Sequence, residues 1–160
     1  MSLTEKKILA NTKKYFETTE KLGVMPDSLR TLLGDKFSLA PSASDSKFGN
    51  AFEGGLIEYL LRVAFYAVRA NNSMPDEEKV NQESLLKVCL LHHIGKLDLN
   101  NVNPAKWSVY YAMSNGVKLT PDEYSAITLC DEKDSTDNTI LGELLKFGMV
   151  FANKQAVNHE

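Results

Sequence analysis

Residues Leu90 to Lys96 read LLHHIGK and place two adjacent histidines and a lysine at the end of an apolar run. Most of that run, from Gln82 to Leu91, is apolar on nearly all sides, which is typical of a helix buried in a core. Gly95 then interrupts the helical pattern. The stretch predicts a central helix that ends at His92 and His93.

A second buried helix is predicted from Gly55 to Ala70, within and after the stretch FEGGLIEYLLRV that starts at Phe52. The glycine pair Gly54 and Gly55 is too short for a phosphate-binding loop, and a turn into the helix explains it. Apolar residues recur at helical spacing and leave only a narrow polar stripe. We expect them to be buried: Leu56, Ile57, Leu60, Leu61, Ala64, Phe65 and Val68.

The rest of the chain is also helical in pattern, without a convincing run of period-two alternation. Gly34 to Gly49, rich in serine and alanine, predicts an irregular loop. Thr120 and Glu123 have the spacing of a capping box at a helix start. The other predicted helices are Leu3 to Lys21, Pro26 to Leu33, Pro104 to Ser114, one from Pro121, and Asn138 to Lys154. The last is expected to bury Leu141, Leu144, Leu145, Val150 and Phe151.

Length and composition predict one all-α domain over residues 1–160, because 160 residues suffice for a single core. The net charge of −3 argues against a general nucleic-acid binder. The first residues lack the apolar segment of a secretory signal, and no stretch reaches the ~20 apolar residues that span a bilayer. We therefore expect a cytoplasmic protein that does not enter the membrane, with Cys89 and Cys130 as reduced thiols.

With these motifs in view, residues 48–152 resemble the HD-domain superfamily of metal-dependent phosphohydrolases, and residues 1–47 form an N-terminal helical extension. The resemblance implies a compact helical bundle. In that family, a histidine after a GGL-type turn, an adjacent His-Asp pair and a late aspartate hold one or two divalent ions. Those ions activate water against a phosphoester, commonly in a nucleotide.

The ligand positions implied by the resemblance are only partly kept. Tyr59 stands where the first histidine would be, and His92 is the retained histidine of LLHHIGK. His93 replaces the aspartate, and Met149 in LLKFGMVFANK falls at the late aspartate. The segment EYSAITLCDE is similar to one that supplies an extra histidine in some members, but here that region holds Leu129 and Cys130.

A water-activating ion usually has about three protein ligands, whereas His92 and His93 supply two at most. Tyrosine and methionine are poor ligands for a hard ion. The sequence therefore predicts an eroded metal site with no catalytic residue and no cofactor. It leaves a pocket for a nucleotide or other phosphoester near Lys96, or for a protein partner. Alternatively, Lys96 has no binding role, because the helix dipole alone favours a lysine near a helix C-terminus.

Other hypotheses stay open for the histidine pair. In the first, an active phosphohydrolase has rebuilt its metal site from His92 and His93 with Asp98 or Asp131 as the missing carboxylate, while Lys96 orients the phosphate. In the second, the pair is structural: one histidine caps the helix or bonds to a backbone carbonyl, and the other packs against tyrosine.

A third function class is a structural or assembly protein. Trp107, Tyr110 and Tyr111 could form a face for a partner or for self-association, because aromatic residues are enriched at interfaces. At helical spacing such residues more often pack on the core. The acidic segment Asp131 to Asp137 lacks the glycine and final glutamate of an EF-hand and is interpreted as a solvated loop.

Overall fold

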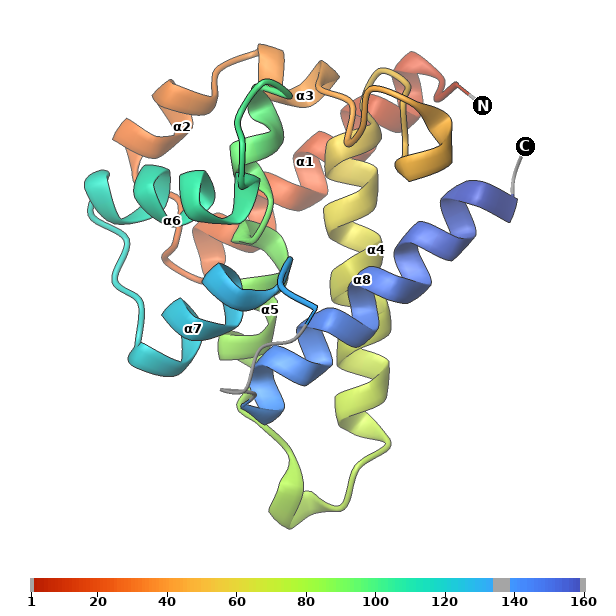
Figure 1. The fold of residues 1–160 in the computed structure, drawn as a ribbon. Coiled ribbons are helices and arrows are strands. Elements are labelled where there is room, and N and C mark those ends of the chain that lie inside the picture. Colours follow the sequence, from red (N-terminus) through yellow and green to blue (C-terminus); the bar gives the residue numbers. More distant parts are fainter. Residues whose placement is uncertain (1, 134–138, 159–160) are drawn as a thin grey trace.

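The computed structural model describes residues 2–133 and 139–158, and all regular elements in these two ranges are helices. The predicted all-α fold is confirmed (Figure 1). The α-helices are α1 (Glu5–Lys21), α2 (Asp27–Leu33), α3 (Lys36–Leu39), α4 (Gly55–Asn72), α5 (Gln82–Leu91), α6 (Pro104–Ser114), α7 (Pro121–Leu129) and α8 (Ile140–Asn158). Short 3₁₀ turns are η1 (Ser46–Phe48), η2 (Asp76–Glu78) and η3 (Ile94–Leu97).

The starts of α1, α5 and α7 are fixed by side chains that accept hydrogen bonds from otherwise unpaired backbone N–H groups. Thr4 accepts from Lys7 at the start of α1, and Asn81 accepts from Ser84 at the start of α5. Thr120 accepts from the N–H of Glu123, so the predicted cap of α7 is confirmed.

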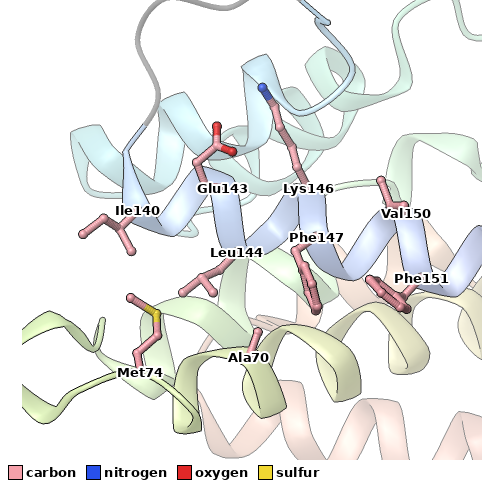
Figure 2. Close-up of a pocket in the computed structure, with 9 residues that line it drawn as sticks. All are labelled: Ala70, Met74, Ile140, Glu143, Leu144, Lys146, Phe147, Val150 and Phe151. Carbon is pink, nitrogen blue, oxygen red and sulfur yellow. The ribbon is translucent and has the colours of Figure 1, made fainter.

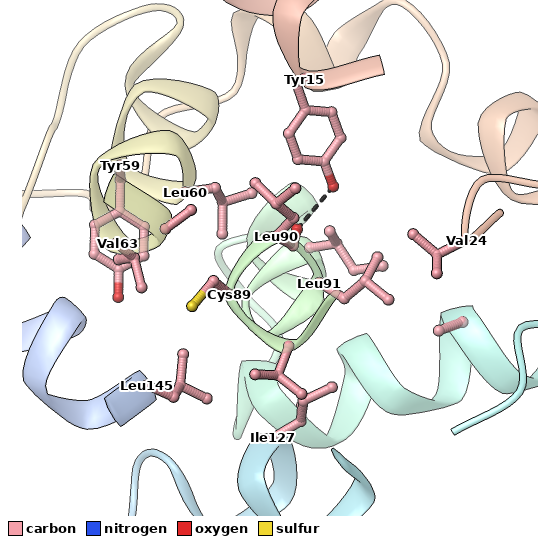
Figure 3. Close-up of a cluster of buried hydrophobic side chains, with 14 of the residues drawn as sticks. Tyr15, Val24, Tyr59, Leu60, Val63, Cys89, Leu90, Leu91, Ile127 and Leu145 are labelled. Atoms are coloured by element: carbon pink, nitrogen blue, oxygen red, sulfur yellow. Dashed lines mark hydrogen bonds between the residues drawn. The ribbon is translucent and has the colours of Figure 1, made fainter. Parts of the chain in front are cut away.

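The predicted central helix is confirmed as α5, which contacts α1, α4, α6, α7 and α8. Viewed along its axis, α5 is surrounded by apolar side chains from its neighbours (Figure 3). Leu85, Val88 and Leu91 of this helix are completely buried. The end of α5 therefore delivers His92 and His93 into the interior of the bundle.

The prediction of an irregular loop from Gly34 to Gly49 is wrong in part, because this segment forms α3 and η1. Phe37 of α3 is fully buried and lies against Tyr15 and Phe16 of α1, with ring centroids 5.3 and 6.1 Å apart. One aromatic anchor thus fixes a short helix in a segment whose serine content suggests a loop.

The predicted burial is also wrong at the outer sides of α4 and α8. Phe65, Val150 and Phe151 are 54%, 50% and 41% exposed, whereas Leu141, Leu144 and Leu145 are buried as expected. α4 and α8 pack against each other (Figure 1) and both contact α5, so each helix buries only the face that it turns toward its neighbours. Apolar residues outside that face stay in contact with solvent.

The hydroxyl of Tyr15 in α1 donates to the carbonyl of Leu90 near the end of α5, at 2.8 Å (Figure 3). Both groups are buried, so Tyr15→Phe leaves this carbonyl without its side-chain donor. We expect the free energy of unfolding to fall by about 1–2 kcal/mol, measured by urea unfolding. Tyr110→Phe is the matched control, since Tyr110 is 62% exposed; equal losses in both variants would contradict the assignment.

Within the described residues, every helix is too short or too polar to cross a lipid bilayer.

Candidate functional site

His92 ends α5 as its C-cap, and both of its ring nitrogens have partners. Nδ1 lies 2.7 Å from the carbonyl oxygen of Cys89, so this nitrogen carries the proton and donates. Nε2 lies 3.1 Å from the hydroxyl of Tyr59 and accepts a hydrogen bond from it. Burial, followed by the neighbouring His93, lowers the pKa of His92 well below its usual value, which keeps the ring neutral.

Tyr59 of α4, which the resemblance aligns with the family's first histidine, lies against both His92 and His93. It is 2% exposed, and its ring stacks on His93 at 5.8 Å between centroids with an 18° interplanar angle. Burial raises the pKa of Tyr59 well above its usual value, so the phenol remains a donor. These contacts are those expected for a structural histidine pair: one ring bonds a carbonyl and the other packs on tyrosine.

His93 lies outside the helical region of the backbone, at φ −126° and ψ 23°, so its ring turns toward α7. Its Nε2 is 2.9 and 3.0 Å from the two carboxylate oxygens of Asp131. Burial lowers the pKa of His93, and the neutral ring donates to the carboxylate. Although burial alone would raise the pKa of Asp131, the hydrogen bond from His93 and the Lys96 charge lower it overall.

Cys130 is the residue of this site that sequence reasoning did not identify. It caps the C-terminus of α7 and places its Sγ 4.0 Å from Nε2 of His93. His93, Cys130 and Asp131 each offer a ligand atom, and these atoms all lie within 4.8 Å of one another. The adjacent pair Cys130 and Asp131 was the available signal, because neighbours at a helix end can both turn toward one point.

Lys96 lies in η3, directly after the histidine pair, with its Nζ 5.3 Å from the centre of the Tyr59 ring. Burial lowers the pKa of this lysine, while the nearby Asp131 and Cys130 act to raise it. The lysine is thus a largely desolvated cation beside the cluster formed by His93, Cys130 and Asp131.

Lys96 and Asp98 also line a hollow of about 260 Å³, whose lining residues do not include His93, Cys130 or Asp131. The opposite wall comes from the segment between α3 and α4, which contributes Ser42 and Ser44. Asp98 accepts the backbone N–H of Asn100 at 2.9 Å. Of the two predicted carboxylates, the structure therefore places Asp131 beside His93 and Asp98 in this separate hollow.

Met149 of α8 packs against the hydrophobic core and is partly buried. A thioether offers no charge to a hard cation. The four ligand positions implied by the resemblance are thus occupied by a phenol, a histidine with both nitrogens engaged, a histidine bonded to Asp131, and a thioether. These residues do not fit a hard divalent ion at the position that the resemblance implies.

The aromatic residues of α6 are divided between core and surface. Tyr111 packs against the core, whereas Trp107 and Tyr110 are 40% and 62% exposed. Asp131 and Glu132 follow α7 together with Lys133, and the remainder of the predicted acidic loop, 134–137, lies outside the described residues.

A larger apolar hollow, of about 590 Å³, lies between the last turns of α4 and the outer side of α8 (Figure 2). Phe147 and Phe151 of α8 point toward Ala70 of α4, and Met74 lies beyond the end of that helix. The walls of this hollow contain few polar groups and do not include either histidine, so we assign no chemical role to it.

Compared with known proteins, the chain matches no protein-family model, no curated protein and no solved structure.

Proposed function

We propose that the chain is a divergent HD-domain-like protein that no longer hydrolyses phosphoesters and instead binds a small phosphate-bearing molecule at Lys96. The observation that carries this proposal is that Lys96 is one of the residues lining a hollow, while both ring nitrogens of the nearby His92 are engaged. A lysine attracts a phosphate without any metal ion.

The dimensions of the hollow favour a phosphate group over a whole nucleotide. Its volume of about 260 Å³ is below the roughly 300–1,000 Å³ of sites that enclose drug-sized ligands. Ser44 in its wall adds a hydroxyl that can donate to a phosphate oxygen. The bound molecule would insert its phosphate and leave the remainder at the surface.

Asp98 lines the same hollow, and its negative charge should repel a phosphate. Lys96 and Asp98 therefore give a matched pair of variants with opposite expected effects on phosphate affinity. Lys96→Met is expected to weaken phosphate binding by roughly ten- to a hundredfold, because a bond to a charged group contributes about 1.5–3 kcal/mol. Asp98→Asn is expected to strengthen it by roughly two- to fivefold through loss of repulsion at a partly exposed site. Amide chemical shifts during titration with inorganic phosphate and adenosine monophosphate measure both effects.

In the wild type, we expect the largest amide shift changes at Ser44 and Lys96. The phosphate affinity should fall in Lys96→Met and rise in Asp98→Asn. Equal affinity in the wild type and in Lys96→Met would overturn the proposal. A third titration in high salt is expected to weaken binding, since the attraction is electrostatic.

The second candidate is a phosphohydrolase with a rebuilt metal site, and one observation favours it. Asp131 lies against His93, as a replacement carboxylate would have to. His92 counts against this hypothesis because releasing Nε2 requires Tyr59 to move. Metal-dependent turnover that His92→Gln or Asp131→Asn abolishes would favour the hydrolase over the binding protein.

A further inference from the structure

We propose that His93, Cys130 and Asp131 form a binding site for a borderline-soft divalent ion such as Zn²⁺ or Co²⁺. Of its three residues, only His93 is among the four positions that the family resemblance implies, while Cys130 lies in the segment that is similar to one supplying an extra histidine in some members. The proposal does not depend on phosphate binding at Lys96.

The donor set selects the class of ion. A thiolate, an imidazole and a carboxylate are the ligands that Zn²⁺ takes in proteins, whereas Mg²⁺ and Ca²⁺ prefer oxygen alone. With Cys130 as thiolate and Asp131 as carboxylate, the three donors carry two negative charges, which balance a dication. The three-donor arrangement also leaves a fourth position for water.

The geometry requires only small movements. In a tetrahedral Zn²⁺ site the metal lies about 2.0–2.3 Å from its ligands, so two ligand atoms are about 3.2–3.7 Å apart. Nε2 of His93 is now 4.0 Å from Sγ of Cys130 and 2.9 Å from the nearer oxygen of Asp131. An ion placed between them would shorten the distance from Nε2 to Sγ and lengthen the distance from Nε2 to the Asp131 oxygen, each by less than about 1 Å.

Burial and access are also suitable for a metal. His93 and Cys130 are 3% and 6% exposed, so their donor atoms are shielded from competing water. The Asp131 side chain is 38% exposed and provides the route from solvent. On metal binding, the Cys130 thiol releases its proton to solvent. Nε2 of His93 also loses its proton, either to solvent or to Nδ1 of the same ring, which has no hydrogen-bond partner among the described residues.

Lys96 separates the metal proposal from the phosphate proposal, because its removal should affect the two affinities in opposite ways. Its ammonium interacts with both Asp131 and Cys130 and adds a positive charge beside the ion. Removing that charge by Lys96→Met should therefore tighten metal binding, although the same variant should weaken phosphate binding. The two proposals can thus fail independently.

The experiment is a titration of chelator-treated, reduced protein with Co²⁺, followed by displacement with Zn²⁺. We expect one equivalent of Co²⁺ and a thiolate-to-cobalt charge-transfer band. Cys130→Ser should remove the band and weaken binding by about a hundredfold or more, because even changes behind a metal ligand cost about 10- to 100-fold. Cys89→Ala, the matched thiol control, should retain the band.

Asp131→Asn supplies a second test at a partly exposed position that does not disturb the core. It should weaken Co²⁺ binding but preserve the charge-transfer band at saturating metal. The absence of a thiolate band in the wild type would overturn the proposal, as would a band that survives in Cys130→Ser. Far-ultraviolet circular dichroism of each variant verifies that the metal-free proteins are folded.

Discussion

Gly148→Ala is expected to lower the free energy of unfolding by about 3 kcal/mol, at the upper end of the range for overpacked positions. Gly148 lies where α8 approaches α4 most closely. A methyl group built on it would meet the backbone carbonyl oxygen of Val63 at 2.5 Å and the Ala67 side chain at 3.2 Å. Because the obstacle is backbone, the two helices would have to separate.

Gly142→Ala is the matched control, since Gly142 lies in the same helix. Its added methyl group would meet the Thr139 hydroxyl at 3.4 Å and Ala126 at 3.7 Å, which is close to ordinary contact. Alanine is favoured over glycine in a helix by roughly 0.5–1 kcal/mol, so this variant should be neutral or stabilised. Urea unfolding of both variants measures the difference, and similar stabilities would contradict the close approach of α4 and α8.

The second large expected effect is a loss of stability as the pH falls below about 6.5, the ordinary pKa of histidine. The folded protein holds His92 and His93 neutral, with pKa values below that of the unfolded chain. Between the unfolded and folded pKa values, the unfolded state binds more protons, so acid favours unfolding. Each histidine contributes a slope of up to about 1.4 kcal/mol per pH unit in this window.

Urea unfolding at about pH 7, 6 and 5, in buffer with a chelator, measures this slope. Because the slope is only half developed at pH 6.5 and continues only down to each folded pKa, the loss between about pH 6.5 and 5 is expected to be at most about 3 kcal/mol for two histidines. His92→Gln should remove about half of the slope, although it also lowers stability at neutral pH. Asp131 acts at lower pH because its pKa is lowered below the ordinary carboxylate range. A flat profile in the wild type would contradict the buried neutral pair.

The sequence predicted the helices because hydrophobic periodicity and capping residues are local signals. The helix from Gln82 to Leu91 is predicted at the bounds that α5 has, and Pro104 to Ser114 coincides with α6. The error at 34–49 has a physical cause. The burial of Phe37 depends on α1, which lies far from it in sequence, so local composition gives no sign of it.

The candidate site was predicted less completely than the fold. Tyr59, His92 and His93 could be grouped in advance because each is tied to a buried helix by its motif. The contribution of Cys130 depends on where α7 ends relative to α5, a relationship that periodicity does not contain. Spacing along the chain likewise could not decide between Asp98 and Asp131, because both directly follow helical segments, η3 and the end of α7.

The proposal that the His92 centre does not hydrolyse phosphoesters is tested most directly by one assay. Wild-type protein, His92→Gln and Asp131→Asn are incubated with a panel of nucleotides and simple phosphoesters in the presence of Mn²⁺, Co²⁺ or Ni²⁺, and released phosphate is measured. The account predicts that the wild type releases no more phosphate than either variant, because both nitrogens of His92 are engaged. Metal-dependent release by the wild type that either substitution abolishes would contradict it.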